Sequence, residues 1–161
     1  MPDGKRSSTT LATEAHRTRM SQAPGARTVL VVDDIEDNRD LYATYFEHSG
    51  FRALEARDGE EALASIAQDM PDVVIMDLAM PSLDGWEATR LIKSNPRTAH
   101  VIVIVVTGTA SNENLASARA AGANEVCTKP CLPRELMDVV ERLLDERERR
   151  IPSVLPPHRS R

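Results

Sequence analysis

The chain alternates short aliphatic runs with longer amphipathic segments. The aliphatic runs cover residues 28–33, 51–56, 72–77, 101–107 and 125–128. Runs of this length predict β-strands, and the first, third and fourth are apolar almost throughout, as expected for parallel strands covered on both faces. The run at 51–56 alternates apolar and polar residues, so we expect it at an edge of the sheet.

Between and after these runs, apolar residues recur at helical spacing. We expect helices over residues 37–48, 59–68 and 85–94, a fourth that Ser111 caps and Gly122 ends after Ala121, and a fifth that Pro133 opens. The first would turn Leu41 and Tyr45 inward, with Tyr42 as a further candidate, and the third would turn Leu91 inward. This alternation predicts an α/β fold, a single three-layer α/β/α domain around a five-stranded parallel sheet.

Length and composition fit one folded domain. Of 161 residues, 41% are hydrophobic but only 3% are aromatic, so the core must consist of aliphatic side chains. Residues 1–26 lack a sustained apolar period and are expected to form a flexible N-terminal arm. Residues 27–147 would form the domain. The last helix is expected to fray, so that residues 148–161, with three prolines, form a flexible C-terminal tail.

Charge is distributed unevenly along the chain. The formal net charge is −5, yet residues 1–27 carry five basic residues against two acidic ones and residues 151–161 carry two arginines and no acid, which leaves −10 on residues 28–150. Such an acidic domain argues against nucleic acid as a partner, because phosphate backbones require clustered Lys and Arg.

Membrane proteins and zinc-thiolate proteins also fit poorly. No apolar run approaches the roughly 20 residues that span a bilayer, and the N-terminus lacks the apolar middle of a signal peptide. We therefore expect a cytoplasmic protein with no membrane partner. Cys127 and Cys131 lack the further His or Cys of a zinc site, so we expect free thiols.

Polar residues stand where the predicted strands end. Asp33 and Asp34 end the first strand, Asp77 the third and Thr107 the fourth, and Lys129 follows the fifth. Because the carboxyl ends of parallel strands share one edge of a sheet, we expect these side chains to lie together. Three close carboxylates repel one another unless a divalent cation sits among them, and Mg²⁺ prefers such ligands. The pattern predicts a magnesium site beside groups that can bind a phosphoryl oxygen.

Each of these residues also has an ordinary structural explanation. A single Asp after a strand is commonly a turn or N-cap residue, Thr107 can simply favour the strand, and Lys129 can be a solvated loop residue. Their joint placement on different strands favours the functional interpretation. Asp77 stands alone at its strand end in a turn-rich context, so we expect it to be the nucleophile that forms an aspartyl phosphate.

Taken in order, four motifs resemble the receiver domain of bacterial two-component response regulators, in its stand-alone, chemotaxis-regulator-like form. They are VLVVDD at 29–34, VVIMDLAMPSLDG at 73–85, VVTG at 105–108 and TKP at 128–130. The resemblance runs over residues 27–147 and implies a flavodoxin-like (βα)5 fold with strand order 2-1-3-4-5. Few residues follow the last predicted helix, so we expect no output domain.

The resemblance implies a role for each residue at the predicted site. Asp77 would accept phosphate from a phosphohistidine of a sensor histidine kinase or phosphotransfer protein. Asp33, Asp34 and Asp77, together with the backbone carbonyl of Ala79, would hold Mg²⁺. Thr107 and Lys129 would bind the phosphoryl oxygens, and the peptide bond between Lys129 and Pro130 would be cis.

The same resemblance implies a signalling protein rather than an enzyme, one that catalyses only its own phosphoryl transfer and autodephosphorylation. Its downstream partner, an unidentified protein, would bind the face formed by the fourth helix, the fifth strand and the fifth helix. We expect a monomer or weak dimer. The expected output is protein contact that depends on phosphorylation.

Two other function classes remain open. Receivers commonly have an aromatic residue in the fifth strand where this chain has Val126, so a receiver-fold interaction module that works without phosphorylation is the main alternative. An α/β phosphohydrolase with an aspartyl nucleophile would need a general-acid Asp two residues after Asp77. Ala79 occupies that position, which argues against a phosphohydrolase.

Overall fold

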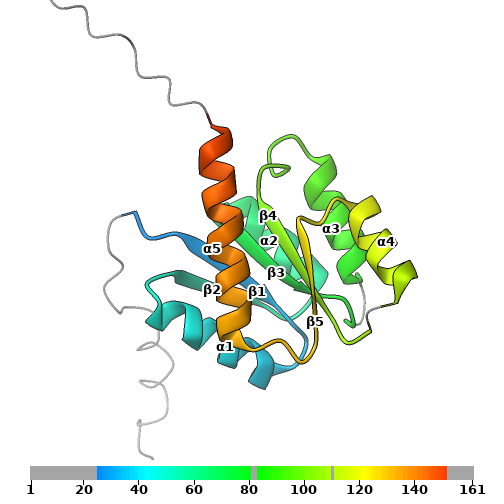
Figure 1. Ribbon diagram of the computed structural model, residues 1–161, viewed down its shortest axis with the longest axis horizontal. Helices are drawn as coiled ribbons and strands as arrows, with labels where there is room; N and C mark the ends of the chain where they lie inside the picture. Colours follow the sequence, from blue (N-terminus) through cyan, green and yellow to red (C-terminus); the bar gives the residue numbers. More distant parts are fainter. Residues whose placement is uncertain (1–24, 81–82, 110, 152–161) are drawn as a thin grey trace, which may run out of the picture.

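A computed structural model describes residues 25–80, 83–109 and 111–151 of the chain and has a central sheet with helices on both faces (Figure 1). Five strands run parallel in the order β2-β1-β3-β4-β5, which confirms the predicted topology and the edge position of the second strand. The strands are β1 (Thr28–Val32), β2 (Arg52–Ala56), β3 (Val73–Asp77), β4 (Ile102–Thr107) and β5 (Glu125–Thr128).

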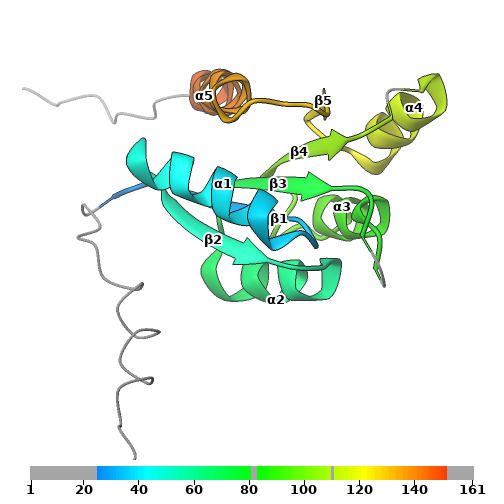
Figure 2. The same cartoon turned by 90° about the horizontal axis from the view of Figure 1, so that it is seen from below.

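Five helices connect and follow the strands, and α1 and α5 lie on the opposite face of the sheet from α2 and α3 (Figure 2). The helices are α1 (Glu36–His48), α2 (Gly59–Asp69), α3 (Gly85–Ser94), α4 (Asn112–Ala121) and α5 (Pro133–Arg150). α4 packs beside α3. As predicted, the Ser111 side chain caps α4, and Gly122 ends it in the left-handed conformation.

The core consists of two apolar clusters, one on each face of the sheet. Along β1, Val29 and Val31 face the cluster under α1 and α5, whereas Leu30 and Val32 face the cluster under α2 and α3. All four side chains are almost completely buried. Because successive strand residues point to opposite faces, a strand covered on both sides must be apolar at every position. Burying each such side chain contributes about 1.5–3 kcal/mol.

Two helix residues that were expected to face inward do not. Leu41 is 55% exposed and Leu91 is 41% exposed. On α1 the buried stripe runs through Tyr42 and Phe46, one residue further along, so Leu41 projects away from the sheet. Tyr45 is only partly buried and packs at the margin of the same cluster.

The C-terminal helix is longer than predicted. It continues to Arg150, past the expected domain end at residue 147. Two residues of its last turns form ion pairs with other parts of the domain, Arg147 with Asp72 and Glu148 with Arg27, and these pairs hold the end of the helix in place. The rest of the expected tail and most of the expected N-terminal arm, residues 152–161 and 1–24, lie outside the described residues. In the part of the chain that is described, no helix is long and apolar enough to cross a bilayer.

Candidate functional site

Three aspartates converge at the carboxyl edge of the sheet. Asp33 and Asp34 follow β1, and Asp77 ends the adjacent strand β3. Because the two strands are parallel neighbours, their carboxyl ends lie side by side and bring the three residues together. One carboxylate oxygen from each lies within 4.8 Å of the others. Asp33 and Asp77 are buried, at 3% and 4% exposure, whereas Asp34 is exposed.

Lys129 lies against this cluster. Its Nζ is 3.3 Å from Oδ1 of Asp77 and 3.4 Å from Oδ2 of Asp33. Burial lowers the pKa of the Lys129 ammonium, but the two carboxylates outweigh burial and raise this pKa above its usual value. The peptide bond between Lys129 and Pro130 is cis, as expected.

The charge on Asp77 is poorly compensated. Burial and the neighbouring carboxylate of Asp33 raise the pKa of Asp77, although Lys129 and the backbone N–H of Ala79 partly oppose them. That N–H lies 3.4 Å from Oδ1 of Asp77, at the long end of the hydrogen-bond range. Three clustered carboxylates, two of which pair with the Lys129 ammonium, carry excess negative charge, and oxygen donors at this spacing match the preference of Mg²⁺. The residues present therefore fit a magnesium ion.

Asp33 is held in place by donors that the sequence analysis did not identify. The backbone N–H of Ile35 donates to its Oδ1 at 2.9 Å, and Nδ2 of Asn38 donates to its Oδ2 at 3.2 Å. Arg39 donates to its backbone carbonyl at 2.9 Å. Asn38 and Arg39 stand in the first turns of α1, directly after the two aspartates. Their polar side chains, so near the predicted start of the helix, were the signal that could have identified them.

The position of Asp77 depends on a close approach of helix α3. A Cβ atom on Gly85 would clash with the backbone carbonyl oxygen of Asp77, so only glycine allows the first turn of α3 to pack this tightly. Asp84 caps the helix, its Oδ1 accepting from the N–H of Glu87 at 2.8 Å. The start of α3 is thereby fixed against the end of β3, where Asp77 lies.

Thr107 is buried at the end of β4, at 4% exposure. Its Oγ1 donates to the carbonyl of Thr109 at 3.3 Å and accepts from the N–H of the same residue at 3.2 Å. The hydroxyl is thus at the predicted edge of the sheet but engaged with the following loop. The backbone carbonyl of Thr107 accepts from the N–H of Lys129 at 2.7 Å, which connects the end of β4 with the segment after β5.

Near the end of β5, an aliphatic side chain and two thiols lie close to the site. Val126 is partly buried against the cluster under α2 and α3 and carries no polar group. Cys127 and Cys131 are free, and burial, followed by the nearby Cys131, raises the pKa of the Cys127 thiol to about 12. The Tyr42 hydroxyl donates to the carbonyl of Cys131 at 2.7 Å, which fixes the segment after Pro130 against α1.

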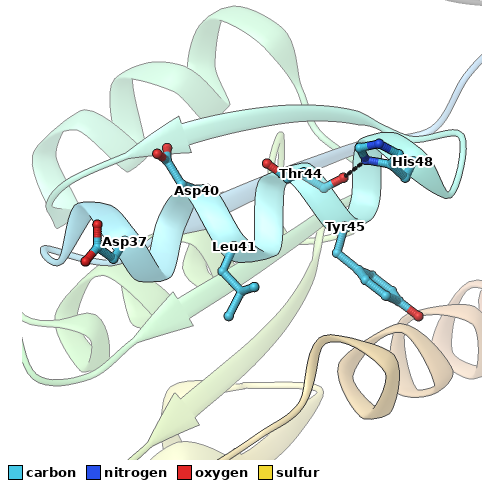
Figure 3. A pocket seen from close by; sticks show the side chains of 6 residues that line it. All are labelled: Asp37, Asp40, Leu41, Thr44, Tyr45 and His48. Carbon is cyan, nitrogen blue, oxygen red and sulfur yellow. Dashed lines mark hydrogen bonds between the residues drawn. The ribbon is translucent and has the colours of Figure 1, made fainter.

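A separate hollow lies on the outer side of α1 (Figure 3). Its volume is about 480 Å³, and its lining residues are Asp37, Asp40, Leu41, Thr44, Tyr45 and His48. None of the three clustered aspartates lines it. Its lining side chains supply apolar surface from Leu41 and Tyr45 rather than a set of converging oxygen ligands, so the aspartate cluster is the stronger candidate site.

Comparison with known proteins identifies the family. The family model for the response regulator receiver domain matches residues 29–141, more than half of the chain. The chain belongs to the receiver family. Receiver domains take phosphate from histidine kinases or phosphotransfer proteins and bind Mg²⁺ at an acidic pocket, and the spacing of the three aspartates in this receiver could hold a metal ion.

Some relatives of this receiver match over nearly their whole length, and others are much longer. Protein PilH of Pseudomonas aeruginosa is 31% identical over 116 residues, which cover 72% of this chain and 96% of PilH. The polar-differentiation response regulator DivK of Brucella anthropi is 28% identical, covering 74% and 98%. By contrast, this receiver spans 22% of the response regulator PleD of Caulobacter vibrioides, at 35% identity over 63% of this chain.

Solved structures agree on the fold. A CheY-like receiver domain protein from Methanospirillum hungatei superposes with a TM-score of 0.73 at 29% identity, covering 77% of this receiver and 98% of the other chain. The chemotaxis protein CheY4 of Vibrio cholerae gives a TM-score of 0.70 at 28% identity, covering 73% and 98%. The fold inferred from the alternating pattern is therefore shown.

Proposed function

We propose that this receiver is a phosphoacceptor whose Asp77 takes a phosphoryl group from a phosphohistidine of a histidine kinase or phosphotransfer protein. The single observation that carries the proposal is the meeting of Asp33, Asp34 and Asp77 with Lys129 at the carboxyl edge of the sheet. In the transfer, a carboxylate oxygen of Asp77 forms a bond to phosphorus as the phosphorus–nitrogen bond breaks. The histidine nitrogen keeps the electron pair.

The magnesium ligands in this proposal are the carboxylates of Asp33, Asp34 and Asp77 and the carbonyl of Ala79. Asp34 is exposed and can bind the ion directly, whereas Asp33 is already held by Ile35 and Asn38. When bound, the ion supplies positive charge that offsets the repulsion between the carboxylates and the incoming phosphoryl group. The hydrogen bonds from Ile35 and Asn38 hold the Asp33 carboxylate in position for the ion.

Lys129 and Thr107 bind the phosphoryl oxygens in this proposal. The Lys129 ammonium already lies against Asp77, so it needs little movement to donate to an oxygen attached to that carboxylate. The Thr107 hydroxyl must turn from Thr109 to reach the same group. Attack of water on phosphorus in the same site would then release phosphate and return Asp77 to the free carboxylate, so this receiver would catalyse its own dephosphorylation.

The proposed output is a change in protein contact at the face formed by α4, β5 and α5. This face lies next to the site, because Lys129 directly follows β5 and the chain continues from β4 to α4. A phosphoryl group that engages Thr107 and Lys129 therefore acts on both connections. The partner would bind the phosphorylated form more tightly.

Phosphorylation by a small donor tests this proposal. Purified protein is incubated with acetyl phosphate and Mg²⁺, and intact mass is measured. We expect one phosphoryl adduct in the wild type and in the control Asp138→Asn, an exposed aspartate on α5, and none in Asp77→Asn or in the presence of a chelator. No adduct in the wild type, or an adduct that survives Asp77→Asn, would refute the assignment of Asp77.

A phosphorylation-independent interaction module is the second candidate, and Val126 is the observation that favours it. A valine is too small to alter the exposed surface by rotating in and out, as an aromatic ring can. The face formed by α4, β5 and α5 would then have the same conformation with and without phosphate on Asp77. Amide resonances over this face that do not change while Asp77 is fully phosphorylated would support this candidate. Changes at this face on phosphorylation would exclude it.

A further inference from the structure

Hydrogen bonds connect the Thr107 hydroxyl with helix α4. Thr107 Oγ1 both donates to and accepts from the backbone of Thr109, at 3.3 and 3.2 Å. The carbonyl oxygen of Thr109 also accepts from Nδ2 of Asn114, at 3.0 Å. Asn114 belongs to the first turn of α4, so one carbonyl group is shared by the candidate switch hydroxyl and a helix side chain.

The backbone of Asn114 is itself anchored. Its N–H donates to Oγ of the capping residue Ser111 at 3.1 Å, and the N–H of Leu115 donates to the carbonyl of Ser111 at 3.0 Å. The helix start is therefore formed independently of Thr109. The Asn114 side chain reaches back from this fixed turn to the loop, and so a movement of Thr109 acts on α4 through it.

We propose that Asn114 is a positioning residue that couples the bonding state of the Thr107 hydroxyl to the first turn of α4. A hydroxyl has one hydrogen to donate. When the Thr107 side chain turns to donate that hydrogen to a phosphoryl oxygen on Asp77, the Thr109 carbonyl loses one donor but keeps Nδ2 of Asn114, and Oγ1 moves away from the Thr109 N–H that it accepted from. The Thr109 peptide then reorients, and Asn114 carries this change into α4. The phosphoryl step rests on the proposed function, whereas the coupling itself does not.

The surroundings of Val126 explain why this connection matters in this chain. Val126 pairs in register with Val105, two positions before Thr107 on β4, and its side chain packs against the apolar cluster under α2 and α3. It offers no hydrogen bond to the Thr107 loop. A signal from Thr107 that leaves by way of Asn114 needs no aromatic residue in β5.

A double-mutant cycle tests the coupling without any phosphate. Thr107→Val removes the hydroxyl at nearly constant volume, and Asn114→Ala removes the amide donor. Backbone amide resonances of residues 112–116 are recorded in the wild type, in both single variants and in the double variant. We expect Thr107→Val to shift these resonances, and we expect the shift to be at least about twofold smaller when Asn114 is absent, because coupled sites are not additive.

Matched variants keep the test sharp. Asn112→Ala removes an exposed asparagine from the same turn and is expected to leave the effect of Thr107→Val unchanged. Asn114→Asp keeps the side-chain size and suits the first turn of a helix, but it has no N–H to donate, so it should act like Asn114→Ala even if that variant folds poorly. An effect of Thr107→Val that is equally large with and without the Asn114 amide would overturn the proposal.

A second measurement separates this proposal from the function proposed above. Asp77 is phosphorylated with acetyl phosphate and Mg²⁺ in the wild type and in Asn114→Asp. We expect the same extent of phosphorylation by intact mass, together with a clearly smaller response of the α4 amides in the variant. Absence of the adduct from the wild type would refute the phosphoacceptor function and leave the coupling to be decided by the double-mutant cycle. A full α4 response in the variant would refute the coupling alone.

Discussion

Strand β3 has an aspartate at each end, and the fold compensates the two charges very differently. Asp72, just before the strand, accepts from the N–H of Thr28 at 2.9 Å and from Nη2 of Arg147 at 2.8 Å. Arg147 also donates to its backbone carbonyl at 3.4 Å. The carboxylate is thus matched by a guanidinium of its own, and it fastens the end of α5 to β1 and β3.

At the other end of the strand, Asp77 shares one ammonium with Asp33, and Asp34 adds a third negative charge. The backbone N–H of Ala79 donates to Oδ1 of Asp77 over a long distance, 3.4 Å. The difference teaches that an acid at the end of a buried strand does not by itself identify a functional site. Excess negative charge that the protein leaves uncompensated does, because a bound cation can balance it.

Replacing each aspartate by asparagine should separate the two ends completely. Asp77→Asn is expected to abolish phosphorylation by acetyl phosphate, because the nucleophile is gone, while Asp72→Asn leaves it intact. Intact mass after a fixed incubation is the measurement. A fall in the phosphorylation of Asp72→Asn comparable to that of Asp77→Asn would mean that the two ends are not independent.

Stability should respond in the opposite sense. Asp72→Ala leaves the Thr28 N–H and the Arg147 guanidinium without their acceptor, and it should lower the free energy of unfolding by about 1–3 kcal/mol. Asp77→Asn, measured without Mg²⁺, should leave that free energy unchanged or raise it, because it relieves repulsion from Asp33. Urea denaturation provides both values. A large destabilisation by Asp77→Asn would contradict the view of this end as uncompensated.

Magnesium affinity should depend on residues that orient the carboxylates. Asn38→Ala removes the side-chain donor to Asp33 and should weaken Mg²⁺ binding about tenfold, as is typical when a partner of a metal ligand is lost. Thr44→Ala, an exposed change further along α1, serves as the control. Calorimetric titration with MgCl₂ gives both affinities, and equal values would show that Asn38 does not position the ligand.

The smallest expected effect is in the dependence of stability on pH. The folded pKa of Asp77 lies above its ordinary value of 3.8, so the folded state binds this proton more tightly than the unfolded chain does. The contribution of Asp77 is therefore favourable below pH 3.8 and is lost as pH rises through the folded pKa. Asparagine does not ionise, so the stability of Asp77→Asn relative to the wild type should increase over the same range in a chelating buffer. A difference that stays constant with pH would contradict the raised pKa.

Features that depend on residues close in the sequence could be predicted, whereas features that depend on contacts between distant segments could not. Strands covered on both faces must be apolar at every position, so β1, β3 and β4 were predicted to within one residue. Helix orientation was less certain. Leu41 and Leu91 are apolar and well spaced, yet both are exposed, because the sheet contacts a stripe one position away.

Residues that act by reaching across the fold were also missed. Asn38 and Arg39 act on Asp33 from the next helix, and Asn114 acts on Thr109 from α4. Their polarity and their closeness to a helix start make them candidates, but the sequence alone does not show which atoms they contact. Their function depends on distances that are set only when the helices dock on the sheet.

The sequence by itself determined the fold class and the positions of the acids, hydroxyl and lysine, because hydrophobic period sets the strands and parallel strands align their carboxyl ends. Only the tertiary structure decided which charges are balanced. Arg147 lies far from Asp72 in the sequence, and Lys129 lies far from both Asp33 and Asp77. The packing of α5 gives Asp72 a guanidinium of its own, whereas the segment after β5 brings one ammonium to both Asp33 and Asp77. The difference depends on the distances between charged groups from separate segments, and the hydrophobic pattern of the sequence does not specify those distances.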